Sequence, residues 1–114
     1  MEVRFKQYSC IAKLGMYGNK RLAIQLIDKH NGEPIATASV NLVHEEVVPE
    51  NSMFIKDYSE NEGMVDALLR ANIIEEKALF YSFSGFVTKI PCHKLTEMAI
   101  THFGIKNEKV INKQ

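Results

Sequence analysis

The chain has 114 residues, of which 14 are Lys or Arg and 14 are Asp or Glu, so its formal net charge is zero. This length predicts one domain, residues 1–105, followed by a polar tail at 106–114. General binders of nucleic acid or of anionic membrane surfaces carry a positive excess, which this chain lacks. Because 46% of the residues are hydrophobic, a disordered chain is also excluded. The composition indicates a compact, soluble α+β domain and does not by itself reveal a function.

The N-terminus alternates in polarity and lacks the apolar stretch of a signal peptide. No run of the sequence approaches the roughly 18 apolar residues that a membrane-spanning helix needs. We therefore expect a cytoplasmic protein with no membrane partner. Cys10 and Cys92 each lie within an apolar stretch, and secreted disulfide scaffolds are much richer in cysteine. Both are interpreted as buried thiols, with a single disulfide as the alternative.

Alternating polarity predicts an antiparallel meander of three strands in the first 43 residues. The alternation changes phase near Gln7, which predicts a β-bulge within the first strand. Asn and Gly residues mark the two connecting turns. The third strand carries Thr37, Ser39 and Asn41 on its more polar face. In chain order the expected elements are a strand at 2–17, a turn at 17–20, a strand at 21–28, a turn at 30–33 and a strand at 34–43.

The rest of the chain predicts two further strands and two helices. The expected elements are a polar loop at 44–52, a strand at 53–58, a helix at 60–72, a strand at 78–90 with a bend at 84–85, and a short helix that ends at Gly104. Ser59 and Glu62 have the spacing of a capping box at the start of the first helix. Pro91 is expected to end the last strand. The predicted fold is one antiparallel sheet of about five strands, meander first, packed with one or two short helices.

No catalytic or metal-binding motif is present in the sequence. The patterns C-x-x-C, H-E-x-x-H and G-x-S-x-G are absent. Cys92 and His93 are neighbours, so on regular structure their side chains point apart and form a poor dyad. The adjacent acids Glu45 and Glu46 fit a solvated loop. We therefore expect no catalytic residue, no metal and no cofactor, and a protein that is not an enzyme.

Polar residues on the strands at 34–43 and 53–58 could gather at one edge of the sheet. Asn41, Asp57 and Asn61 are the central candidates. A buried polar group there needs hydrogen-bond partners, and Asp57 could also cap the following helix. One interpretation is a hydrogen-bonded loop anchor, and the other is a notch that binds a partner or a small polar ligand. The residues assigned to the notch are Asn41, Asp57, Asn61, Tyr58, Glu45 and Glu46.

Positive side chains concentrate in the first two predicted strands. They are Arg4, Lys6, Lys13, Lys20 and Arg21. With Tyr8 and Tyr17 to stack on bases, these residues could bind single-stranded nucleic acid. The alternative is the ordinary solvated face of alternating strands, and nucleic acid is the less favoured partner. Acids concentrate between residues 44 and 76, so the neutral charge is the sum of a basic meander and an acidic middle. A surface with separate basic and acidic regions suits a specific protein partner.

Three short segments carry a resemblance to a known pattern. Residues 32–42 are similar to G-E-P-x-A-x-x-x-V-N-L, residues 54–61 to F-x-x-D-x-N before a helix, and residues 84–91 to S-G-F-x-x-Y-P. Over about residues 20–95 the chain resembles a family of small uncharacterised domains found in bacterial phages and conjugative mobile elements. It departs from that pattern at 58–60 and at 89–90. The resemblance implies a shared fold and an accessory protein of a mobile element.

These observations favour a non-enzymatic interaction module that binds and modulates a host protein, for example by inhibiting a defence system. The contact surface would be a strand edge or the region 44–62. The alternatives are a small-ligand or nucleotide-binding domain at the polar notch, and a single-stranded nucleic-acid binder through the N-terminal strands. An exposed first or last strand could also pair across a two-fold axis to form a homodimer.

Overall fold

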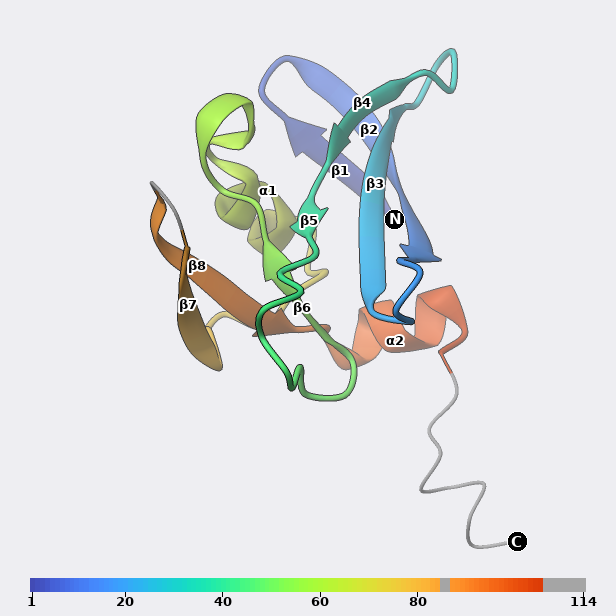
Figure 1. The fold of residues 1–114 in the computed structure, drawn as a ribbon. Helices are drawn as coiled ribbons and strands as arrows, with labels where there is room; N and C mark the ends of the chain where they lie inside the picture. Colours follow the sequence, from blue (N-terminus) through green and yellow to red (C-terminus); the bar gives the residue numbers. More distant parts are fainter. Residues whose placement is uncertain (85–86, 106–114) are drawn as a thin grey trace, which may run out of the picture.

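A computed structural model describes residues 1–84 and 87–105, which form two four-stranded antiparallel sheets and two short helices (Figure 1). The strands are β1 (Glu2–Phe5), β2 (Tyr8–Met16), β3 (Leu22–Asp28), β4 (Pro34–Thr37), β5 (Ser39–Val40), β6 (Ser52–Ile55), β7 (Phe80–Ser84) and β8 (Val87–Lys94). The helices are α1 (Met64–Arg70) and α2 (Glu97–Phe103), with a 3₁₀ turn η1 (Ser59–Asn61) before α1. The predicted α+β class is confirmed, whereas the predicted single sheet of about five strands is replaced by two sheets.

The two sheets have the strand orders β1-β2-β3-β4 and β5-β6-β8-β7. The first sheet is the predicted meander with one additional strand. The predicted tail at 106–114 and Gly85 of the predicted bend lie outside the described residues. Among the residues that the structure describes, no helix is long and apolar enough to cross a membrane.

The predicted first strand, 2–17, is a hairpin and not one bulged strand. β1 pairs with β2 so that Val3 lies opposite Cys10 and Phe5 opposite Tyr8. The turn contains Lys6, whose φ is +55°. Because paired residues point to the same face, the hairpin places odd-numbered Val3 and even-numbered Cys10 in one core. A reversal of the chain therefore changes the phase of the alternation as a bulge does, and this is why the bulge prediction was wrong.

The predicted third strand, 34–43, is divided between the two sheets. β4 pairs with β3, whereas β5 pairs with β6. Ala38, which lies between them, is fully buried; its N–H donates to the carbonyl of Ile24, and its own carbonyl accepts from the N–H of Lys56. Ser39 was expected on a polar face but is buried, and its Oγ accepts from the N–H of Ile24 at 3.1 Å. The chain thus crosses from one sheet into the other at Ala38.

One main core connects both sheets and both helices. Its buried residues are Val3, Phe5, Cys10, Ala12, Ile24, Leu26, Ala38, Met53, Ile55, Met64, Ala67, Leu68, Ile73, Ile74, Leu95 and Ala99. A smaller core lies on the other face of the second sheet, where Phe54 packs against Leu42, Ile90 and Cys92. Phe80 meets Phe54 edge-on, with 5.6 Å between the ring centroids. The second sheet is therefore apolar on both faces, because successive side chains of β6 point into different cores.

The predicted strand 78–90 is also a hairpin, formed by β7 and β8. Pro91 does not end it, because Pro91 lies within β8 opposite Tyr81. Proline has no amide hydrogen, and the pairing of β8 with β6 accordingly extends only from Cys92 to Lys94. Among the residues that the structure describes, β7 pairs only with β8 and forms one edge of the second sheet (Figure 1).

The first helix is shorter than the predicted 60–72 and is capped by a different residue. The predicted capping box does not form, because Ser59 has a φ of +54° and no side-chain cap bond is made. Asp57 supplies the cap: its Oδ1 accepts from the N–H of Gly63 at 2.6 Å, and its Oδ2 accepts from the N–H of Val65 at 3.3 Å. One carboxylate thus binds two of the amides that a helix start leaves without partners.

The second helix agrees with the prediction. Thr96 caps its start by accepting a hydrogen bond from the N–H of Ala99 at 3.0 Å. Gly104 follows its end with a φ of +70°, a conformation that glycine adopts without strain.

The cap at Asp57 gives a test of this fold. Replacing Asp57→Ala should lower the free energy of unfolding by about 1–2 kcal/mol, because two backbone amides lose their acceptor. Replacing the exposed neighbour Glu62→Ala should change it by less than about 0.5 kcal/mol. Urea denaturation followed by circular dichroism measures both variants, and equal losses would contradict the assigned cap.

Candidate functional site

The three central residues of the predicted notch make separate hydrogen bonds. Asp57 caps α1, as described above. Asn61 is buried, and its Nδ2 donates to the carbonyl of Thr37 at 2.7 Å. The Oδ1 of Asn41 instead accepts from Asn19 at 3.1 Å, beside the turn between β2 and β3. Asp57 and Asn61 hold the chain's own backbone, and Asn41 does not join them.

The other three residues assigned to the notch surround it without a shared contact. Tyr58 is half-buried against the smaller core, and the Nζ of Lys56 lies 5.6 Å from the centre of its ring. Glu45 is half-buried, and its backbone carbonyl accepts from the guanidinium of Arg21. Glu46 is exposed. A ligand-binding role for these residues stays a prediction.

Two of the five cations predicted to bind nucleic acid hold loops of the protein itself. Arg21 donates to the carbonyls of Leu42, at 2.7 Å, and Glu45. Lys6 donates to the carbonyl of Glu60 at 2.6 Å. The remaining three cations are exposed: Arg4, Lys13 and Lys20. The cationic charge that a nucleic acid could contact is therefore smaller than the sequence indicates.

Both cysteines are buried free thiols, as predicted. Burial raises the pKa of Cys10, and burial together with the charge of Glu45 raises the pKa of Cys92 to about 11. The neighbouring His93 is engaged elsewhere, since its Nδ1 is hydrogen-bonded to the carbonyl of Glu75 at 2.9 Å. Because the thiolate is the reactive form of cysteine, neither thiol is placed to act as a nucleophile. Within the described ranges, no three His, Cys, Asp or Glu side chains are grouped to hold a metal.

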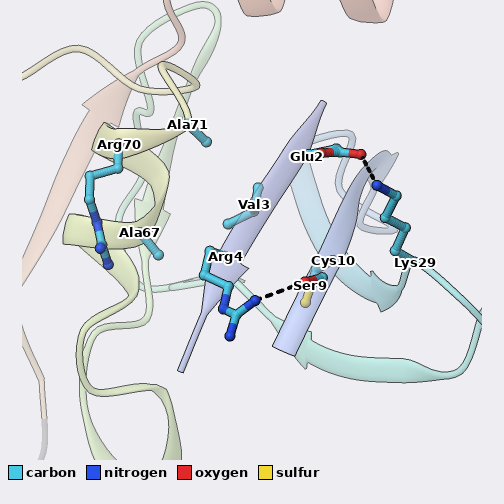
Figure 2. Close-up of a pocket in the computed structure, with 9 residues that line it drawn as sticks. All are labelled: Glu2, Val3, Arg4, Ser9, Cys10, Lys29, Ala67, Arg70 and Ala71. Atoms are coloured by element: carbon cyan, nitrogen blue, oxygen red, sulfur yellow. Dashed lines mark hydrogen bonds and ion pairs between the residues drawn. The ribbon is translucent and has the colours of Figure 1, made fainter. Parts of the chain in front are cut away.

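A pocket of about 310 Å³ lies between β1 and α1 (Figure 2). Its residues are Glu2, Val3, Arg4, Ser9, Cys10, Lys29, Ala67, Arg70 and Ala71. Ala67 and Ala71 are four residues apart and so lie on the same side of the helical turn. Their side chains are too short to fill the space in front of β1. No sequence pattern predicted this pocket, because it depends on how α1 packs against the N-terminal hairpin.

The charges around the pocket are only partly paired. Lys29 forms an ion pair with Glu2 at 2.6 Å, and this contact lowers the pKa of the Glu2 carboxyl. Arg70 pairs with Asp66 at 3.0 Å, one helical turn away. For Arg4, the described part of the chain provides no carboxylate within 4.0 Å. Of the three cations that line the pocket, Arg4 is therefore the one without a carboxylate partner among the described residues.

Large apolar side chains are exposed along the edge strand β7 and the residue before it. Leu79 and Tyr81 are each 49% exposed, and Phe83 is 65% exposed. Alternate residues of a strand share one face, so Tyr81 and Phe83 lie on the same face of β7. Together with Leu79, in the bend just before the strand, they are here called the β7 row. The Nζ of Lys89 lies 5.3 Å from the centre of the Tyr81 ring. Sequence analysis predicted a strand here but did not place it at an edge, because strand order depends on tertiary structure.

The backbone of β7 is also open for pairing at its centre. Tyr81 lies opposite Pro91, which has no N–H and cannot exchange two hydrogen bonds with it. The N–H and carbonyl of Tyr81 therefore point away from β8, toward the open edge. Edge strands commonly resist further pairing by means of charged residues or proline, and residues 80–84 contain neither.

Comparison with known proteins finds no matching family model, no matching curated protein and no matching solved structure. The resemblance to domains of phages and mobile elements therefore stays a prediction. The candidate sites rest on this structure: the β7 row and the pocket between β1 and α1.

The buried thiols lead to a direct prediction. In the native protein both Cys10 and Cys92 should react with a disulfide reagent at least about a hundredfold more slowly than in denaturant, because burial disfavours the thiolate. Absorbance of the released thiol measures the two rates. Rapid labelling of either cysteine without denaturant would show that the thiol is accessible and would reopen the question of a catalytic cysteine.

Proposed function

We propose that this protein is a non-enzymatic interaction module that binds a partner protein along β7. The observation that carries the proposal is the β7 row on an open strand edge. A contiguous apolar patch on a soluble protein commonly marks an interaction site. The partner would add an extended segment beside β7, bond to the backbone of Tyr81 and cover the exposed side chains of Leu79 and Phe83.

The charge beside the β7 row narrows the chemistry of the partner. Lys89 lies on the same face as Tyr81, since it is two residues from the paired Pro91. Residues 80–84 of β7 contain no acidic side chain that could pair with its ammonium group. An extended segment with apolar residues in alternate positions and an acidic residue near Lys89 would fit this surface. Such a segment would gain affinity from backbone bonds and apolar burial, and orientation from the ion pair.

The resemblance to accessory proteins of phages and mobile elements supports a host protein as that partner. Binding would then modulate the host protein, and inhibition of a defence system is one form of such modulation. A second copy of this chain is the competing occupant of the same edge. Nucleic acid is less favoured, because the β7 row is uncharged and two of the five candidate cations are engaged within the fold.

Paired substitutions at the β7 row test the proposal. The double variant Tyr81→Lys, Phe83→Lys adds two charges to the row, and the matched control Met16→Lys, Met98→Lys changes two exposed methionines elsewhere. Capture from a bacterial lysate, quantified by mass spectrometry, should give a partner that binds wild type and control equally. The β7 variant should retain at least about tenfold less of it, as expected when interface anchors are lost.

Two outcomes would contradict the proposal. One is a set of captured proteins that the β7 variant retains as well as the control does. The other is a wild-type dimer that the β7 variant converts to a monomer, measured by light scattering on the purified proteins. That result would assign the edge to a second copy of the chain. Thermal melts of all three proteins check that each one is folded.

A further inference from the structure

We propose that the partner segment beside β7 anchors an arginine side chain in a second cavity, at the end of the second sheet beside α2. This anchor depends on the proposed function, because it holds the same partner segment, and it names a residue type that the segment carries. Three features support it. The cavity adjoins the β7 row, an added strand presents alternate residues toward the cavity, and the walls of the cavity combine apolar and acidic side chains.

The cavity, here called the α2 cavity, has a volume of about 360 Å³ and lies where β6 and α2 begin and β8 ends (Figure 1). Ser52 and Lys94 are directly paired between β6 and β8, so they lie on one face of the sheet. Glu97 and Ile100, three residues apart in α2, form a second wall. The loop at 49–51, just before β6, forms a third. Three separate elements of the fold therefore enclose this space.

Leu79 connects the α2 cavity to the β7 row. It lines the cavity, and it directly precedes Phe80, the first residue of β7. Its N–H donates to the carbonyl of Cys92 at 2.8 Å, which holds it against β8. Its side chain is half-exposed. A segment that runs beside β7 and continues past Phe80 therefore meets the cavity.

The pairing of β7 determines which residue of an added segment faces the α2 cavity. Phe80 lies opposite Cys92, and Cys92 shares a face of β8 with Lys94, which lines the cavity. Tyr81 and Phe83 lie on the other face of β7. The residue that bonds to the backbone of Tyr81 therefore covers those two rings, and its neighbour beside Phe80 faces the side of the cavity. An added strand lies about 4.8 Å beyond β7, so this neighbour needs a long side chain to reach the cavity.

The walls of the α2 cavity match a long apolar stem with a cationic head. Pro49, Leu79 and Ile100 offer apolar surface to the methylene groups of an arginine. Glu50 and Glu97 are exposed, and among the described residues neither carboxylate has a cation within 4.0 Å. A guanidinium binds carboxylates through paired N–H donors, which the single ammonium of a lysine cannot provide. Arginine is also among the residues that contribute most to binding at protein interfaces.

The charges at the two ends of β7 give the segment a direction. In the described part of the chain, Lys94 is the one cation that lines the α2 cavity, so with two carboxylates the lining has a charge of −1. An acidic side chain is therefore disfavoured there. Lys89 lies at the other end, since its register falls between the pairs Ser82–Ile90 and Ser84–Val87. A segment with an acidic residue near Lys89 and an arginine near Leu79 consequently fits in one direction only.

Selection from a phage-displayed library of random peptides tests the anchor without a known partner. The library is panned against the wild-type protein and against each variant, and the bound peptides are sequenced. Wild type should select alternating apolar residues with an arginine at a fixed spacing from them. The double variant Glu50→Lys, Glu97→Lys should keep the apolar pattern but select an acidic residue in place of the arginine, because the charge of the cavity is reversed. The matched control Glu33→Lys, Glu46→Lys changes two exposed acids that do not line the cavity and should select the wild-type pattern.

A synthetic peptide from the wild-type selection then measures the size of the effect by isothermal titration calorimetry. Replacing its arginine with alanine should weaken binding to wild type at least about tenfold, the loss expected for charge-assisted hydrogen bonds. Replacing the arginine with lysine should recover only part of that loss. The variant Glu50→Gln, Glu97→Gln should bind the arginine and alanine peptides within about threefold of each other, because it lacks the carboxylates that the arginine contacts.

The outcomes separate the anchor from the proposed function. Apolar peptides selected without arginine would overturn the anchor alone, and so would arginine that persists when Glu50 and Glu97 become lysines or disappears in the control variant. Peptides that the Tyr81→Lys, Phe83→Lys variant binds as well as wild type would contradict binding along β7 itself. A wild-type protein that selects no specific peptide would count against both. All of the substituted residues are exposed, and circular dichroism checks that each variant is folded.

Discussion

The backbone of Ala38 hydrogen-bonds to both sheets, and the rest of the structure depends on this junction. Its N–H donates to Ile24 of β3 at 2.8 Å, and its carbonyl accepts from Lys56, just after β6, at 2.8 Å. The next residue, Ser39, uses its buried hydroxyl to bond the N–H of Ile24 and the hydroxyl of Tyr17. The alanine methyl is fully buried, so a larger side chain at this position would overpack the core. The junction therefore fixes how the second sheet departs from the first.

Both candidate surfaces follow from this junction. The residue before it, Thr37, offers its carbonyl to the buried amide of Asn61, which precedes α1. Together with the cap at Asp57, this bond positions α1 beside β1 and leaves the pocket between them. On the other side, β5 and β6 begin a sheet that continues through β8 to β7, which is its last strand in the described part of the chain. One hydrogen-bonded crossing thus accounts for a pocket at one sheet and an open edge at the other.

The sequence predicted local structure better than it predicted which elements meet. The α+β class and the helix that ends at Gly104 follow from composition, spacing and cap residues, which act within a few positions. The phase change near Gln7 fits a bulge or a hairpin equally, because both reverse the face of the following residues. Pro91 was expected to end a strand, and only the partial pairing of β8 with β6 explains how it fits inside one.

The candidate sites were harder to predict, for the same reason. The sequence singled out Asp57 and Asn61 as polar residues near a helix start. Only their hydrogen-bond partners in the structure distinguish a loop anchor from a ligand-binding notch. The pocket lies beside the small side chains of Ala67 and Ala71. Two alanines in a helix do not predict a pocket unless it is known that β1 lies opposite them. The β7 row contains apolar residues in a strand, which normally indicate burial. Their exposure follows from strand order, a property that local sequence does not encode.

The zero net charge has a limited meaning for these two surfaces. At physiological salt, charges interact strongly only within about 8 Å, so a binding site is governed by its own lining and not by the total charge. Two of the three cations that line the pocket, Lys29 and Arg70, are paired with acids, whereas residues 80–84 of β7 are uncharged. A neutral chain cannot attract polyanions over long distances. Neither candidate surface depends on such long-range attraction. The pocket and the β7 row belong to different sheets, so each surface is governed by its own side chains and not by the total charge.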